Sequence, residues 1–235
     1  MRYCIASAAP LFFSLAAFAQ DFLPDSVVYK RALDQTISYN ISLDARTSGL
    51  YTGSRYVRDY YHAKGYPFFE TDSFQKGDIF YNGVLYKNAD LLYDLSTDNV
   101  VTKYSEDANI VLVREKISYF KLRGHLFVAG NDALDRGFYD VLFTGKIEIL
   151  AHRRKELTPW SKSMEFDATF SQTSNYFIYK DSSYYKVNNK QELLDVLKDK
   201  KTELKEFISK NRFDFRKNFE TALLRTAMYY DHTAK

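Results

Sequence analysis

Short apolar runs separated by turn residues dominate the sequence between residues 78 and 187. The runs recur at intervals of roughly 8 to 12 residues, which is typical of an all-β meander, sandwich or barrel. The clearest unit joins residues 79–81 to 84–86 through Asn82-Gly83, a pair that favours a tight type I′ hairpin. Because the other loops are also short, we expect neighbouring strands to pair antiparallel.

The same pattern predicts further strands along this part of the chain. A polar connection through Pro159 and Trp160 separates the last three from the rest. The expected strands are 91–95, 100–104, 110–114, 117–122, 126–129, 138–143, 147–150, 166–170, 176–179 and 184–187.

After Asn189 the apolar period changes from two to about 3.6, which indicates helix. Asn189 and Glu192 resemble a capping box, so a helix is predicted from about Lys190 to Ser209. A second amphipathic stretch, 215–230, predicts another helix, and the pair should form an αα-hairpin.

The N-terminus has the features of a secretory signal peptide. Arg2 precedes an apolar run over residues 5–16, and Ala17-Phe18-Ala19 offers a cleavage site, so we expect cleavage near Ala19 and an exported, periplasmic or secreted protein. Cleavage removes Cys4, the only cysteine, so the mature chain has no thiol for a disulfide or a metal. No later apolar stretch is long enough for a transmembrane segment.

Several segments resemble a family of secreted Bacteroidota proteins that has no assigned activity. The likeness covers most of the mature chain, and the segments that carry it are 65–69, 74–86 (FQKGDIFYNGVLY), 92–94, 139–150 (YDVLFTGKIEIL) and 189–231. The resemblance implies an envelope or exported location and an open antiparallel sheet similar to the half-barrels of periplasmic lipid carriers. It transfers no catalytic or binding residue.

Together these observations predict a mainly β (α+β) fold, a curved antiparallel β-meander or half-barrel followed by a C-terminal αα-hairpin. The predicted parts are the signal peptide (1–19), a mixed N-terminal region that packs on the sheet (20–73), the sheet (74–188) and the helical hairpin (189–235).

Composition narrows the classes of function. Apolar residues make up 46% of the chain, enough to close a core, so intrinsic disorder is not expected. The formal net charge is only +3, with both signs mixed along the chain, which argues against a nucleic-acid partner.

Short catalytic and metal motifs are not evident. The four histidines show no metal-ligand spacing, and His125 and His152 are interpreted as residues of solvent-exposed sheet edges. There is no G-x-S-x-G, phosphate loop or dinucleotide fingerprint. We therefore assign no catalytic residue, no metal ligand and no cofactor, although a site assembled from distant strands would leave no such pattern.

Asp90, Asp94 and Asp98 share parity along the chain. The favoured interpretation places Asp90 and Asp98 in turns and Asp94 in solvent on the outer face of the sheet. The alternative places Asp94 on a concave face, where burial would raise its pKa and suit it to acid catalysis or ligand orientation.

Aromatic residues are the remaining unusual feature: 20 Tyr and 19 Phe. Most should pack across strands, and the rest suggest a recognition surface. The leading hypothesis is a non-enzymatic binding or carrier protein for a lipid, another apolar ligand or an envelope partner. The alternatives are a small-substrate enzyme that uses carboxylates such as Asp94, and a structural component of an envelope assembly. The candidate ligand-binding residues are Tyr81, Tyr86, Tyr93, Asp94 and Phe120.

Overall fold

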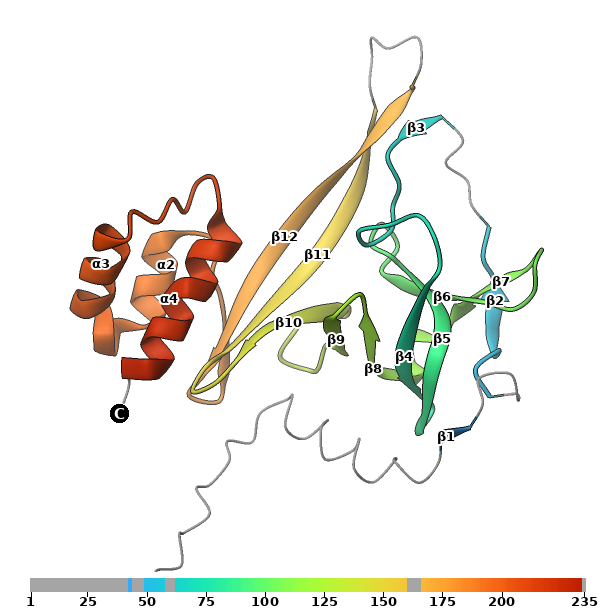
Figure 1. The fold of residues 1–235 in the computed structure, drawn as a ribbon, viewed down its shortest axis with the longest axis horizontal. Helices are drawn as coiled ribbons and strands as arrows, with labels where there is room; N and C mark the ends of the chain where they lie inside the picture. The colour runs from blue at the N-terminus through green and yellow to red at the C-terminus, as the bar shows by residue number, and fades with distance from the viewer. Residues whose placement is uncertain (1–41, 44–48, 58–61, 160–165, 234–235) are drawn as a thin grey trace, which may run out of the picture.

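A single curved sheet organises the chain, and three helices follow it (Figure 1). The computed structural model describes residues 42–43, 49–57, 62–159 and 166–233. The fold is mainly β with C-terminal helices, as predicted. The predicted signal peptide and the first part of the mixed N-terminal region lie outside the described residues.

The sheet runs in the order β13-β12-β11-β10-β9-β8-β4-β5-β6-β7-β2, and every pair on this path is antiparallel. In addition, β1 pairs with β5 and β3 pairs with β12, both in parallel. The strands are β1 Ser42–Leu43, β2 Gly53–Arg55, β3 Ala63–Lys64, β4 Gln75–Tyr81, β5 Val84–Asp94, β6 Asn99–Lys103, β7 Asn109–Leu112, β8 Ile117–Leu122, β9 His125–Ala129, β10 Phe138–Thr144, β11 Glu148–Pro159, β12 Ala168–Lys180 and β13 Ser183–Lys186.

Tight turns close the hairpins where the sequence predicts them. Asn82 and Gly83 have φ values of 50° and 80°, and Arg123 and Gly124 have 52° and 84°, as a type I′ turn requires. One expected pairing is wrong: β7 and β8 are consecutive but not neighbours. After the short 3₁₀ turn Arg114–Lys116, β8 returns to pair with the other edge of β4.

Three strands are longer than predicted, because pairing continues across polar residues that interrupt the apolar pattern. β5 continues through Asn88, whose φ of 54° marks an irregularity, so Asp90 lies inside a strand and not in a turn. β11 and β12 pair without interruption from Glu148 with Tyr179 to Pro159 with Ala168. Figure 1 shows the outer part of this hairpin extending beyond β10, with β3 beside its end, where it pairs with Ala168 and Thr169.

The sheet curls until β5 touches β11, although four strands separate them on the sheet path. The backbone N–H of Lys155 donates to the carbonyl of Leu95 at 3.2 Å, and the N–H of Leu95 donates to Pro67 at 3.0 Å. The antiparallel sheet is therefore strongly curved, as expected, and it has an interior.

Helices α2 (Lys190–Val196), α3 (Lys201–Lys210) and α4 (Phe219–Thr233) pack beside the sheet, against the apolar faces of β11 and β12. The Asn189 side chain accepts the Glu192 N–H at 2.9 Å, which confirms the predicted cap. The single helix predicted over 190–209 is wrong: a 3₁₀ turn at Lys198–Lys200 interrupts it. The break allows both halves of the apolar stripe to reach one core, so the hairpin is a three-helix unit.

Candidate functional site

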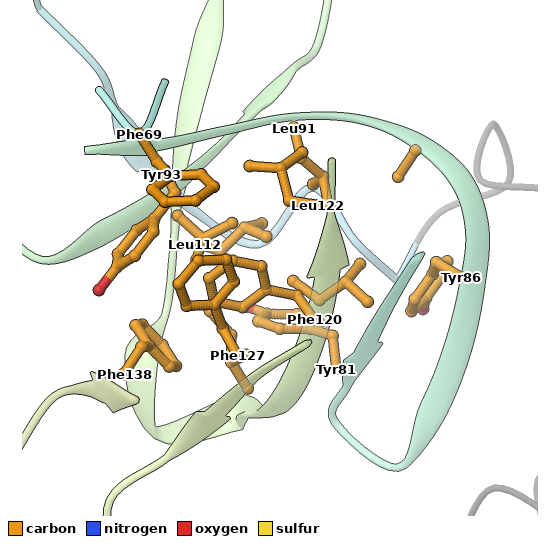
Figure 2. Close-up of a cluster of buried hydrophobic side chains, with 14 of the residues drawn as sticks. Phe69, Tyr81, Tyr86, Leu91, Tyr93, Leu112, Phe120, Leu122, Phe127 and Phe138 are labelled. Atoms are coloured by element: carbon orange, nitrogen blue, oxygen red, sulfur yellow. The ribbon is translucent and has the colours of Figure 1, made fainter. Parts of the chain in front are cut away.

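The four aromatic residues selected as ligand-binding candidates lie in one buried cluster inside the curled sheet (Figure 2). Tyr81 and Phe120 are 0% exposed, Tyr93 is 1% exposed and Tyr86 is 3% exposed. Their rings belong to the core and not to an open face, so ligand binding by these residues stays a prediction.

Aromatic rings fill the centre of this cluster. The rings of Phe120 and Phe127 stack with centroids 4.8 Å apart, and Tyr93 meets Phe120 edge-on at 5.1 Å. Phe138 meets Phe120 at 5.2 Å, and Phe69 meets Phe127 at 5.0 Å. Contacts of this kind add about 0.5–1.5 kcal/mol each beyond the burial of area. The interior is therefore packed by the chain's own side chains.

Two buried tyrosines also satisfy their hydroxyl groups within the protein. Tyr81 donates to the carbonyl of Thr52 at 2.7 Å, and Tyr93 donates to Oδ1 of Asp98 at 2.6 Å. Burial, reinforced by the nearby Asp98 carboxylate, raises the pKa of Tyr93 well above its ordinary value. Both hydroxyls act as hydrogen-bond donors here and fix the orientation of their rings.

Asp94 is fully buried, so the favoured interpretation that it is solvated on the outer face is wrong. Its Oδ1 accepts the Ser96 N–H at 2.9 Å, the Ser96 hydroxyl at 2.7 Å and the Thr97 N–H at 3.3 Å. Its Oδ2 accepts the Tyr56 hydroxyl at 3.0 Å. The carboxylate of Asp94 can be buried because the turn that follows it supplies hydrogen-bond donors, and in return the carboxylate holds the backbone of that turn.

Asp98 lies in a turn, as predicted, with φ of 56°, but it is also buried. Its Oδ2 lies 2.7 Å from the Arg114 guanidinium, which also donates to the Asp98 carbonyl at 2.6 Å. Arg114 and Asp98 therefore tie the turn before β6 to the segment after β7.

His152 is buried against this turn and not at an exposed sheet edge, so that prediction is wrong. Its Nε2 makes no hydrogen bond within the described structure and lies 4.0 Å from Oδ2 of Asp98. Gly137 lies between them: a Cβ there would stand 2.7 Å from the imidazole and 2.8 Å from the carboxylate. Burial lowers the pKa of His152, although the nearby Asp98 carboxylate opposes this shift. The lowered pKa favours the neutral imidazole at pH 7.

A second histidine, His125, pairs with a buried carboxylate. Nδ1 of His125 lies 2.9 Å from Oδ2 of Asp140, which is fully buried on β10. The other ring nitrogen, Nε2, lies 3.8 Å from a Glu70 carboxylate oxygen, and the His125 side chain is 30% exposed. A buried carboxylate of this kind holds the imidazole as the Nδ1–H tautomer, so Nε2 can accept a proton.

Arg153 connects this pair to the helices. Its Nε donates to Oδ2 of Asp140 at 2.8 Å, and its two terminal nitrogens donate to the Glu220 carboxylate at 2.8 and 3.1 Å. The Tyr176 hydroxyl adds a bond to Glu220 at 3.0 Å. Burial alone would raise the pKa of Glu220, but the bonds to Arg153 outweigh it and the pKa is lowered. The result is an ionic link between the sheet and the start of α4.

Sequence patterns missed this network because its members are distant along the chain. A signal was nevertheless present. Asp140 interrupts the apolar run of β10, and Arg153 follows the apolar run of β11, at the end of the buried stretch of that strand. A charged residue within a buried strand requires a buried partner, and each of these residues is the other's partner.

No group of three His, Cys, Asp or Glu side chains within the described ranges could hold a metal ion. Every helix in the described part of the chain is too short or too polar to cross a membrane. Neither a protein-family model, nor a curated protein, nor a solved structure matches this chain. Function must therefore be argued from the geometry above.

Proposed function

We propose that this chain is an exported, non-enzymatic binding protein of the cell envelope, and that its ligand is another polypeptide and not an apolar small molecule. The observation that carries the proposal is the packed interior. Tyr81, Tyr93 and Phe120, the residues best suited to an apolar ligand, are at most 1% exposed and belong to one core cluster, in which the Tyr93 and Phe120 rings meet. A lipid would have to displace this packing, which costs several kcal/mol for each large side chain.

The arrangement of the helices supports the same conclusion. The helices belong to a separate apolar cluster with Ile149 and Ile178, beside the curled sheet and not inside it. The interior of the curled sheet is filled by side chains of the strands and of the segments around them, and the helices do not enter it. The outer part of the β11–β12 hairpin projects beyond β10, and a projecting hairpin suits contact with another protein.

Native mass spectrometry of the protein purified from the envelope of its own bacterium tests this proposal. We expect the mass of the polypeptide without lipid, and no fluorescence gain when 1-anilinonaphthalene-8-sulfonate or palmitate is added at neutral pH. In-cell cross-linking from the outer part of the β11–β12 hairpin should give one dominant protein adduct. A stoichiometric lipid in the purified protein would contradict the proposal.

The Asp140–His125 pair favours one second candidate, an enzyme that uses Nε2 of His125 as a general base. Asp140 would hold the tautomer and stabilise the imidazolium that forms, and Glu70 would lie beside the accepted proton. The base of this candidate enzyme is His125 and not Asp94, because turn donors occupy the Asp94 oxygens, whereas the His125 side chain is partly exposed.

Chromogenic ester, phosphate and glycoside substrates test the second candidate. Turnover by the wild-type protein should fall by about 10²-fold or more in His125→Gln, the range expected for loss of a general base. His62→Gln is the matched control. An inactive wild-type protein, or turnover that His125→Gln leaves unchanged, rules this candidate out.

A further inference from the structure

The outer edge of β12 is interrupted, and the interruption is the basis of this inference. One edge of β12 pairs with β11 along its whole length. The other edge carries β3 at Ala168 and Thr169 and β13 from Phe177 to Lys180. Between them, over residues 171–175, no strand of the described structure pairs with this edge. We call this stretch the open edge.

The backbone groups that face outward there can be identified from the register. The carbonyl of Tyr176 accepts the Val187 N–H at 2.8 Å, and the Tyr176 N–H donates to the side chain of Asn188 at 3.3 Å. Tyr176 therefore directs its N–H and C=O away from β11. Alternate residues of a strand share this direction, so Gln172 and Ser174 do the same. The open edge thus offers two N–H and two C=O groups in line with β13.

Within the described residues, the open edge also lacks the features that normally protect exposed strands. Proteins guard such edges with lysine, proline, bulges or covering loops. Residues 171–175 read Ser-Gln-Thr-Ser-Asn, with no proline and no charge, and their pairing with β11 has no register shift. Ser171, Gln172 and Thr173 are exposed. An edge of this kind can accept an additional strand.

The charges around the open edge indicate what the additional strand carries. Arg154 lies opposite Thr173 on β11, and Lys186 lies opposite Phe177 on β13; both are exposed. Glu156, opposite Ser171, is the one exposed acid on the paired β11 residues. On the strands that flank the open edge the exposed bases therefore outnumber the exposed acid, and Glu192 lies beyond the end of the edge, where its carboxylate accepts the Asn188 N–H at 2.7 Å. A second copy of this chain would bring the same basic residues together, so charge favours an acidic partner.

We propose that the open edge of β12 binds an extended, acidic segment of another protein as an added strand, an inference that rests on the proposed function. Main-chain hydrogen bonds to Gln172 and Ser174 would supply affinity. Arg154 and Lys186 would select acidic side chains.

The test uses the full mature chain and a short peptide of alternating valine and glutamate, with binding measured by calorimetry or fluorescence anisotropy. Gln172→Pro removes an outward N–H without breaking the ladder to β11. It should weaken binding by about tenfold or more, and Gln172→Ala should not. The same peptide with alternate amides N-methylated should also fail to bind, which tests the edge without altering the protein.

Three results would overturn the inference. The first is binding that ignores both Gln172→Pro and N-methylation. The second is equal binding of a valine–lysine peptide, and the third is a concentration-dependent dimer that Gln172→Pro abolishes. If Gln172→Pro does not fold, amide hydrogen exchange of the wild-type protein decides: the peptide should protect the N–H groups of Gln172 and Ser174, and unchanged exchange contradicts the proposal.

The results that would contradict the proposed function differ from those that would contradict this inference. A protein adduct from the β11–β12 hairpin, combined with no peptide binding at the open edge, would leave the function standing and remove this inference. A bound lipid without a protein adduct would remove the function itself.

Discussion

Two of the buried carboxylates of this protein are held by several donor groups each. Asp94 has four donors, and Asp140 has both His125 and Arg153. An isolated charge in the core would cost far more free energy than folding supplies, so each of these groups fixes the position of the others.

Asp140→Ala should therefore be strongly destabilising. It leaves the Arg153 guanidinium and the His125 ring without their shared buried carboxylate, and losing one member of a buried pair costs about 3–5 kcal/mol. The matched control is Asp90→Ala, which breaks the exposed Lys76–Asp90 pair and should cost at most about 1 kcal/mol. Urea unfolding of the two variants measures the difference. Equal losses would show that the buried network adds nothing.

The Arg153–Glu220 link predicts a dependence of stability on pH. Glu220 has a folded pKa lowered from its ordinary 4.5, mainly because the Arg153 bonds outweigh burial. A carboxylate with a depressed pKa stabilises the fold above its unfolded pKa, and the contribution is lost as the pH falls through the folded value. The free energy of unfolding of wild type should exceed that of Glu220→Gln at pH 7, and the gap should close as the pH falls below 4.5. A gap that is constant down to pH 3 would contradict this.

At the scale of elements, turns and caps were predictable because their signals are local. Asn82-Gly83 closes a hairpin because both residues adopt positive φ, and Asn189 begins a helix because its side chain reaches the N–H of Glu192. Strand lengths were less predictable. Pairing with a neighbour carried β5 and β12 across polar residues that the pattern treats as boundaries.

Asn189→Ala should lower the free energy of unfolding by about 1 kcal/mol, since it removes the side-chain acceptor for the first turn of α2. Gln191→Ala, on the exposed face of the same helix, should change it by no more than about 0.5 kcal/mol. Thermal unfolding by circular dichroism compares the two. A stability loss at Gln191 as large as that at Asn189 would argue against capping as the cause.

At the scale of the whole molecule, the curvature of the sheet determines which residues form the interior. Lys155 and Leu95 come from distant parts of the chain, and their backbone contact joins β11 to β5. That contact closes the sheet over Phe120 and its neighbouring rings. Figure 2 shows these rings pointing toward one another. The aromatic residues that the composition suggested for a recognition surface therefore form a core.

Phe120→Ala should cost about 3–5 kcal/mol, because the ring is fully buried and contacts Tyr93, Phe127 and Phe138. Met228→Ala is the control: the side chain is 50% exposed, and the change should stay within about 0.5 kcal/mol. Chemical denaturation measures both. A small loss of unfolding free energy in Phe120→Ala would indicate a loosely packed interior, which would favour an apolar ligand.

Local backbone preferences and the period of apolar residues specify the class of fold, most of the turns, the helical cap at Asn189 and the β-rich region, so these features could be predicted before the structure. The tertiary structure decided that Tyr81, Tyr93 and Phe120 lie in the core, that Asp140 meets His125 and Arg153, and that part of the β12 edge has no strand beside it. Each of these depends on which distant strands become neighbours, and that is set by the curvature of the sheet and by long-range pairing, which no short stretch of sequence encodes.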